Sequence, residues 1–205
     1  IGASIIPLET IKKICGTLLG EKIKFNIPGL LFIDTPGHAA FTTLRKRGGN
    51  IADIAILVVD INEGFRPQTI ESVEILKNFK TPFVIAANKI DLIPGYRQID
   101  KNLVKNINSQ DPYVVEKIET KAYELVGKLS ELGFNAERFD RVEDYTKQVA
   151  IVPVSAINGD GIPELLMVLM GLAQKFLEQS LRIHVKGNAK GTVLEVKETQ
   201  GLGKT

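Results

Sequence analysis

Hydrophobic and polar positions follow two periods along this chain. Short apolar blocks typical of buried β-strands cover residues 30–34, 53–60, 81–89 and 149–154. Helical spacing separates them, in one stretch from Pro67 through Lys77 and another from Pro163 through Glu178. This alternation predicts an α/β fold, a mostly parallel sheet with helices on both faces.

The segment before the first of these blocks predicts one further strand. Lys22 to Ile27 alternates, with Ile23, Phe25 and Ile27 on one face. The following Pro-Gly pair is a turn signal. We therefore expect residues 22–27 to form a hairpin with residues 30–34.

Two segments depart from the strand–helix alternation. Residues 95–147 are polar and helix-rich, with the best helix at 113–132, and we interpret them as an insertion on the rim of the sheet. From Leu181 onward, alternating stretches separated by glycines, 182–185 and 192–196, predict the first hairpin of a separate β-domain. The expected division is therefore 1–180 and 181–205.

Composition excludes several classes of protein. Of the 205 residues, 44% are hydrophobic and 24% charged, which is ordinary for a globular protein, and the net charge of +2 implies no partner by itself. The single cysteine, Cys15, excludes an internal disulfide framework and fits a reducing cytosol. The apolar stretches are far too short to span a membrane.

Polar residues with phosphate-binding character follow the strand at 30–34. Asp34 is suited to hold Mg²⁺ through a water, and Gly37 lets a backbone N–H approach a terminal phosphate. His38 follows at the position where a water would attack in line, and we assign it the catalytic role of orienting that water. Taken alone, Asp-x-x-Gly is also a common turn at the end of a strand.

Asn88-Lys89-Ile90-Asp91, after the strand at 81–89, has the chemistry of a guanine site. The Asp91 carboxylate can accept from guanine N1–H and the N2 amine, which adenine lacks, and such paired bonds reject the wrong base by roughly 10⁴ or more. Asn88 would bridge loops, and the stem of Lys89 would cover one base face. Ser155-Ala156 would supply a backbone N–H to guanine O6. The alternative interpretation is an Asn/Asp turn ending a strand.

Two further motifs, one basic and one beginning with glycine, are weaker evidence for a function. Arg45-Lys46-Arg47 either neutralises a helix C-terminus or contacts a nucleic-acid backbone, and both interpretations stay open. The terminal Gly203-Lys204-Thr205 imitates half of a phosphate loop, but the first glycine of that motif would fall at Glu198. Residues 1–205 therefore contain no G-x-x-x-x-G-K-[ST] loop.

With these residues together, the chain resembles the translational GTPases. Within them it is most similar to the initiation factor that joins ribosomal subunits, bacterial initiation factor two and its archaeal and eukaryotic counterpart, factor five-B. Asp-Thr-Pro-Gly-His is shared with elongation-type factors, whereas Ala-Phe-Thr-Thr-Leu-Arg and Arg-Pro-Gln-Thr point to the initiation factor. The long insertion resembles the archaeal or eukaryotic form. The matching stretches are residues 34–47, 60–69, 87–91 and 155–156.

The resemblance implies a Ras-like P-loop GTPase G domain, followed by a β-barrel that begins at 181. It implies GTP or GDP with Mg²⁺ as cofactors and ribosome-stimulated GTP hydrolysis as the activity, in a cytoplasmic monomer. The implied partners are the ribosome, with large-subunit RNA near the switch helix, and initiator tRNA through domains beyond Thr205. Other initiation factors are further implied partners.

One departure from the family changes what we expect of residues 1–205. The phosphate loop, its strand and the Mg²⁺-binding threonine of the first switch would precede Ile1. That strand would lie between the strands at 30–34 and 53–60, so we expect this stretch alone neither to fold well nor to bind GTP. Two alternatives stay open, an elongation- or selenocysteine-type GTPase and a non-hydrolysing, G-like module that docks on the ribosome.

Overall fold

A parallel four-stranded sheet is the centre of the protein, whose structure is a computed structural model. It describes residues 2–18, 25, 27–35, 52–177, 198–199 and 203–204. The strand order is β3 (Ala55–Asp60), β4 (Phe83–Asn88), β6 (Val149–Pro153) and β5 (Ala136–Arg138), with every neighbouring pair parallel. The predicted α/β class is therefore confirmed.

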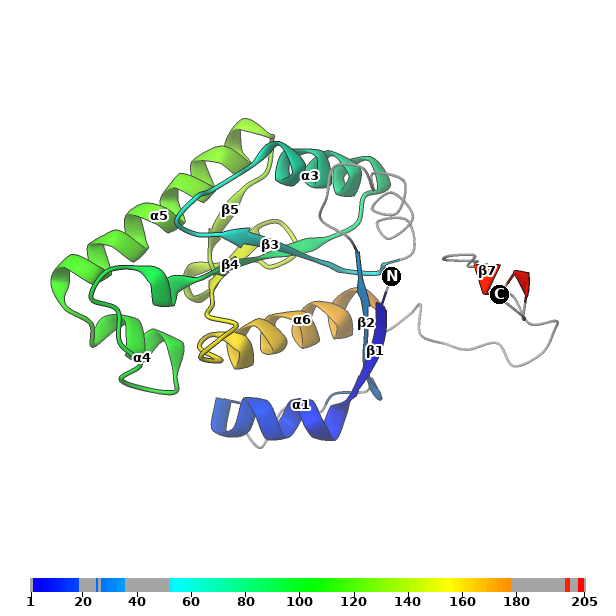
Figure 1. Ribbon diagram of the computed structural model, residues 1–205, viewed down its shortest axis with the longest axis horizontal. Coiled ribbons are helices and arrows are strands. Elements are labelled where there is room, and N and C mark those ends of the chain that lie inside the picture. Colours follow the sequence, from blue (N-terminus) through cyan, green and yellow to red (C-terminus); the bar gives the residue numbers. More distant parts are fainter. Residues whose placement is uncertain are drawn as a thin grey trace.

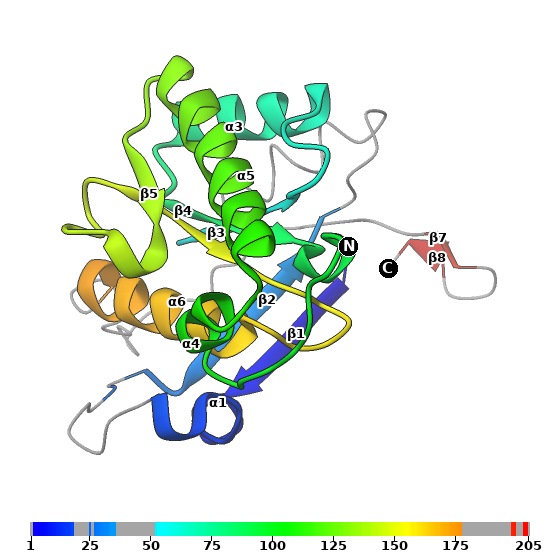
Figure 2. The same ribbon diagram turned by 90° about the vertical axis from the view of Figure 1, so that its left-hand side faces the viewer.

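Helices cover both faces of this sheet. Figures 1 and 2 show α3 (Pro67–Phe79) and α5 (Pro112–Glu131) on one side, and α6 (Ile162–Leu177) with α1 (Leu8–Cys15) on the other. The central strand β4 is buried from Phe83 to Ala87 because it has a neighbour on each edge and helices on each face, which explains its unbroken apolar run. The remaining short elements are η1 (Gly16–Leu18), η3 (Ile90–Leu92), α4 (Leu103–Asn108) and η4 (Phe139–Arg141).

Helix α3 begins where the local sequence predicts and continues two residues beyond the predicted end at Lys77. Pro67 occupies its first turn, where a missing N–H is harmless, and the Thr69 hydroxyl accepts from the Arg66 backbone N–H at 3.3 Å. The helix ends at Lys80, which adopts a left-handed conformation with φ 56°. The chain then turns directly into β4.

The hairpin expected from residues 22–27 is wrong where the structure describes that segment. Strand β2 (Gly29–Asp34) pairs antiparallel with β1 (Gly2–Pro7), in a register running from Gly2↔Asp34 to Pro7↔Gly29. Phe25 and Ile27 lie outside any strand. Ile27 is buried in the hydrophobic core instead, so its apolar character serves packing rather than strand pairing.

The insertion at 95–147 contributes a strand to the sheet as well as helices at its rim. Its helix, expected at 113–132, is confirmed as α5, which follows the short helix α4. It also supplies β5, which pairs with β6 from Ala136↔Val149 to Arg138↔Ile151 and was not expected. The insertion therefore extends the sheet by its outermost strand.

The two sheets β1–β2 and β3–β4–β6–β5 are separate within the described residues. There, β3 pairs with β4 only and β2 with β1 only, and Val58 in the middle of β3 is 62% exposed. The basic cluster Arg45–Arg47 and the expected hairpin of 182–185 with 192–196 lie outside the described residues. Near the C-terminus the structure describes only the pair β7 (Glu198–Thr199) and β8 (Gly203–Lys204). No described helix has both the length and the apolar character needed to cross a membrane.

Candidate nucleotide-binding site

The loops that follow β4 and β6 lie side by side at one edge of the sheet. Because these strands are parallel neighbours, both loops leave at their carboxyl ends, the usual ligand side of an open α/β sheet. The Val154 N–H donates to Ala87 O at 2.8 Å, and the Ile90 N–H donates to Val154 O at 3.2 Å. The structure thus brings residues 88–91 together with Ser155 and Ala156.

Asn88 joins these two loops, as the sequence predicted. Its Oδ1 accepts from the Lys89 N–H at 2.8 Å and from the Ala156 N–H at 3.0 Å, across 68 positions of sequence. The predicted donor to guanine O6 therefore already has a partner. A nucleotide oxygen at this place must share the Ala156 N–H with Asn88 or replace it.

Lys89 is held in an unusual conformation by two residues that sequence analysis did not single out. It adopts φ 70°, and its Nζ lies 2.8 Å from Asp60 Oδ2. Asn62 Nδ2 donates to Lys89 O at 3.1 Å. Asp60 ends β3 in register with Asn88, so its place at the same sheet edge, within the family-like stretch 60–69, was the available signal.

The Asp60–Lys89 pair shifts both groups toward their charged forms. Burial acts to raise the pKa of Asp60, but hydrogen bonds from Lys89 and Asn62 and the charge of Lys89 lower it overall. The hydrogen bond to Asp60, and then the charge of that carboxylate, raises the pKa of Lys89. The ammonium is therefore fixed beside β3, which orients the aliphatic stem of Lys89 at the sheet edge.

Asp91 is the unpaired acid of this edge. It lies in η3, directly after the fully buried Ile90, and is partly exposed. Within the described part of the chain, no hydrogen bond or ion pair engages its carboxylate. Both of its oxygens are thus available to the donors of a ligand.

The loop from Ser155 to Gly161 is tightly wound. The Ser155 N–H donates to Asp160 O at 2.9 Å, and Ser155 O accepts from the Gly159 N–H at 2.8 Å. Gly161 has φ 72°, and a Cβ there would lie 2.1 Å from Pro153 O. Only glycine fits that position, because the loop folds back onto the end of β6.

The phosphate side of the predicted site is described only in part. Asp34 ends β2 and is exposed, and among the described residues its carboxylate has no partner and no link to the guanine-side residues. Gly37 and His38 lie outside the described residues. An exposed carboxylate at a strand end fits Mg²⁺, which takes one or two carboxylates beside phosphate oxygens and water. It does not need a cluster of three acidic or histidine side chains, and the described residues contain none.

Comparisons with known proteins agree with this chemistry. The family model described as "Elongation factor Tu GTP binding domain" matches residues 8–175. Proteins called "Probable translation initiation factor IF-2" from Methanothrix thermoacetophila and Methanoculleus marisnigri are 60% and 58% identical over 206 residues. Each alignment covers 100% of this chain and 34% of the relative, so the chain spans about a third of these curated relatives.

Solved structures give the same picture. The crystal structure of GDP-bound aIF5B from Aeropyrum pernix is 55% identical with a TM-score of 0.87, covering 100% of this chain and 34% of that one. Elongation factor SelB from Methanococcus maripaludis, at 22% identity and TM-score 0.51, covers 82% of this chain and 31% of its own, and shows the fold alone. Because the family match spans every described residue of the site, the chain belongs to the family of elongation factor Tu GTP binding domains, among relatives named IF-2 and aIF5B.

Proposed function

We propose that this chain is the GTP-binding and GTP-hydrolysing part of a translation initiation factor, which promotes ribosomal subunit joining and placement of initiator tRNA. One observation carries the proposal. Asn88 Oδ1 fixes the loop of Ser155–Ala156 against the loop of Asp91, whose carboxylate is unpaired among the described residues. The names of the relatives support it, and so does the GDP bound to aIF5B from Aeropyrum pernix.

Base selection follows from the groups at this edge. Asp91 accepts from guanine N1–H and the N2 amine, while adenine leaves that carboxylate unpaired beside the N1 lone pair. The Lys89 stem covers one face of the base, and the Asn88 side chain lies at the base edge. A backbone N–H of Ser155–Ala156 donates to O6.

Exchanging Asp91 for asparagine tests base selection directly. Xanthine carries an oxygen where guanine carries the N2 amine, so an asparagine amide can donate to it. In the complete natural protein we expect wild type to bind GDP more tightly than ADP or xanthosine diphosphate, by about 10⁴-fold or more. Asp91→Asn should prefer xanthosine diphosphate, as measured by calorimetric titration.

Asp111→Asn is the matched control for that exchange. Asp111 caps α5 through a bond from the Tyr113 N–H, a role that asparagine fills equally well. This variant should keep the wild-type preference. An Asp91→Asn protein that still prefers GDP would contradict the proposed site.

Hydrolysis is assigned to the phosphate side. Asp34 would hold Mg²⁺ through a water, and the bound ion supplies neutralisation of phosphate charge. Gly37 gives a backbone N–H access to the terminal phosphate, and His38 orients the attacking water. We expect His38→Ala to retain GDP affinity and to lose ribosome-stimulated hydrolysis. Normal stimulated hydrolysis by that variant would contradict the role given to His38, whereas a wild-type protein without any stimulated hydrolysis would favour the non-hydrolysing alternative.

The domain division and partners complete the proposal. Residues 1–180 form the G domain and 181–205 begin a β-barrel, and the protein acts as a cytoplasmic monomer. Arg45–Arg47 near the switch contacts ribosomal RNA, and initiator tRNA is contacted beyond Thr205, where other initiation factors can also bind. The selenocysteine-type alternative has only the fold in its favour, because SelB is 22% identical to this chain.

The upstream strand expected between β2 and β3 also belongs to this proposal. The separate sheets β1–β2 and β3–β4–β6–β5 and the exposed Val58 support it, since an added strand would pair with β2 and β3. We expect residues 1–205 in isolation to bind GDP far more weakly than the complete protein. Equal affinity of the two for GDP in parallel titrations would contradict this expectation.

A further inference from the structure

Side chains of the insertion donate hydrogen bonds to one buried carboxylate in the loop of residues 155–161, which we call the candidate guanine loop. Asp160, which is 4% exposed, lies in that loop, and its backbone oxygen accepts from the Ser155 N–H. Tyr96 OH donates to Asp160 Oδ2 at 2.9 Å, and Gln98 Nε2 donates to Oδ1 at 2.5 Å. Both oxygens of the carboxylate are thus held by side chains from the start of the insertion.

The Tyr96 hydroxyl is itself held by a second hydrogen bond. The fully buried Asn106 donates through Nδ2 to Tyr96 OH at 2.6 Å. Asn106 Oδ1 accepts from the Ile99 N–H at 2.8 Å and from Gln110 Nε2 at 3.1 Å, so its own orientation is set. We call Tyr96, Gln98, Asn106 and Asp160 the Asp160 cluster.

In this cluster Tyr96 and Gln98 donate hydrogen bonds and the Asp160 carboxylate accepts them. Burial, followed by the hydrogen bond to Asp160, raises the pKa of Tyr96 far above its usual value, so the phenol stays a donor at physiological pH. Asp160 lies two residues before α6 begins, and both of its carboxylate oxygens accept from side chains of the insertion.

Residues 156–159 of this loop are held by hydrogen bonds but not by burial of their side chains. Ala156, Ile157, Asn158 and Gly159 are exposed, and Gly159 has φ 83° with no atom near its missing Cβ. A loop that is ordered before a ligand arrives binds it more tightly, because its conformational entropy has already been lost. The insertion supplies that order mainly at Asp160, with a weaker 3.4 Å bond from Gln98 Nε2 to Asn158 O.

We propose that Tyr96 and Gln98 are positioning residues for the guanine site, which act through Asp160 to hold Ser155 and Ala156 in place and so set how long a guanine nucleotide stays bound. This inference rests on the proposed function. It gives the insertion a role in nucleotide retention. The contact with the base itself remains with Asn88, Asp91 and the Ser155–Ala156 backbone.

Tyr96→Phe in the complete natural protein is the test, since it removes a single oxygen and keeps the ring. We expect GDP to dissociate about tenfold faster, the size that follows from losing a hydrogen bond to a carboxylate, with association unchanged. Tyr113→Phe is the matched control. Tyr113 lies in the same insertion, is 54% exposed, and its hydroxyl bonds to no described residue.

A sulfur-substituted nucleotide separates positioning from general loosening. Sulfur at position 6 is a poor acceptor, so 6-thio-GDP gains little from a well-placed Ala156 N–H. We expect Tyr96→Phe to accelerate dissociation of 6-thio-GDP by less than half the factor seen for GDP. An equal factor for both nucleotides would mean that Tyr96 acts on stability alone, and would overturn the inference.

A nucleotide-free measurement completes the design. Amide hydrogen exchange at Ser155 and Gly159 should accelerate in Tyr96→Phe and in Gln98→Ala, which changes an exposed side chain. Exchange in β4 should stay unchanged. If wild type binds GDP but Tyr96→Phe behaves as Tyr113→Phe does, only this inference falls. If wild type binds no GDP, the proposed function falls, and this inference falls with it.

Discussion

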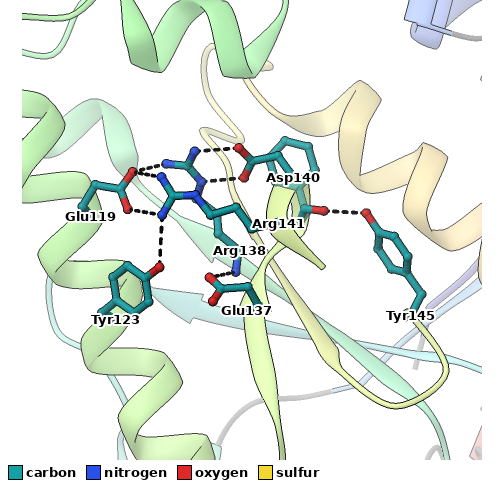
Figure 3. A network of polar contacts seen from close by, with 8 residues as sticks. Glu119, Tyr123, Glu137, Arg138, Asp140, Arg141 and Tyr145 are labelled. Carbon is teal, nitrogen blue, oxygen red and sulfur yellow. Dashed lines mark hydrogen bonds and ion pairs between the residues drawn. The ribbon is translucent and has the colours of Figure 1, made fainter. Parts of the chain in front are cut away.

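Two buried polar networks begin in the insertion, and they are built on opposite principles. In the Asp160 cluster, an acid is bound by the neutral donors of Tyr96 and Gln98. In the second, shown in Figure 3, Arg138 is 4% exposed and is bound by two acids. Its Nε and Nη2 each lie 2.6 Å from an Asp140 oxygen, and Nη1 bonds to Glu119.

The two networks also end in different places. The Arg138 network joins α5 to β5 and η4 inside the insertion, and Arg141 extends it with a 2.8 Å bond to Glu119. The Asp160 cluster leaves the insertion and ends at the candidate guanine loop. Bonds between two charged groups are harder to break than bonds from a neutral donor to a carboxylate, so the first network is suited to hold the fold and the second to place a loop.

The largest expected effect is on Arg138. Arg138→Met leaves Glu119 and Asp140 without their buried partner, so the free energy of unfolding should fall by about 3–5 kcal/mol. Urea denaturation measures this loss. Arg141→Met removes an exposed partner and should lose only about 1 kcal/mol. Comparable losses in the two variants would erase the distinction between the buried and exposed arginines.

Gly161→Ala should come next, and it tests the loop itself. The new Cβ meets Pro153 O and needs a left-handed backbone, so we expect about 3 kcal/mol of lost stability. Gly159→Ala needs the same backbone region but meets no atom within 4 Å, so it should lose about 1 kcal/mol. Thermal denaturation of both variants measures the contribution of the close approach alone.

Asn88→Ala should act on binding more than on folding. It removes the acceptor of the Ala156 N–H and the bridge between the loops, so we expect GDP affinity to fall by about 2 kcal/mol, or roughly 30-fold. Unfolding in urea should change by less than about 1 kcal/mol, because Asn88 is only partly buried. A variant that lost stability without losing affinity would assign Asn88 to the fold alone.

The smallest effect is the acid dependence of the Arg138 network. Burial acts to raise the pKa of Asp140, but the hydrogen bond and charge of Arg138 lower it overall. A depressed folded pKa gives stability that is present above the unfolded value, near 3.9, and is lost as pH falls through the folded value. Asp140 is partly exposed, so solvent screening limits this contribution to about 1 kcal/mol. Urea midpoints of wild type and Asp140→Asn should therefore differ at pH 7 and approach each other as the pH falls below the unfolded value of about 3.9.

Local sequence signals were enough to predict much of the fold and the proximity of the guanine-side residues. The unbroken apolar run of β4 and Pro67 at the start of α3 are readable in the sequence. Parallel strands end at one edge, so the approach of Asn88 to Ala156 followed from the strand assignment. The role of these residues in nucleotide binding stays a prediction.

Contacts between distant residues explain what could not be predicted. Strand β5 contains the charged Arg138, whose partner Glu119 lies 19 positions earlier, and nothing local marks it as buried. The Tyr96–Asp160 bond spans 64 positions, again with no local signal. The sequence of β1, Gly-Ala-Ser-Ile-Ile-Pro, does not alternate between apolar and polar residues, whereas residues 22–27 do. The alternation therefore predicted the wrong partner for β2.

The place of β6 between β4 and β5 has a consequence for synthesis of the chain. β4 leaves the ribosome before the whole insertion, and its partner β6 follows only after it. At roughly 5–20 residues per second, several seconds pass in which β4 presents an apolar, unpaired edge. Closing so long a segment also slows the pairing. A nascent chain that stalls within the insertion therefore exposes an aggregation-prone strand.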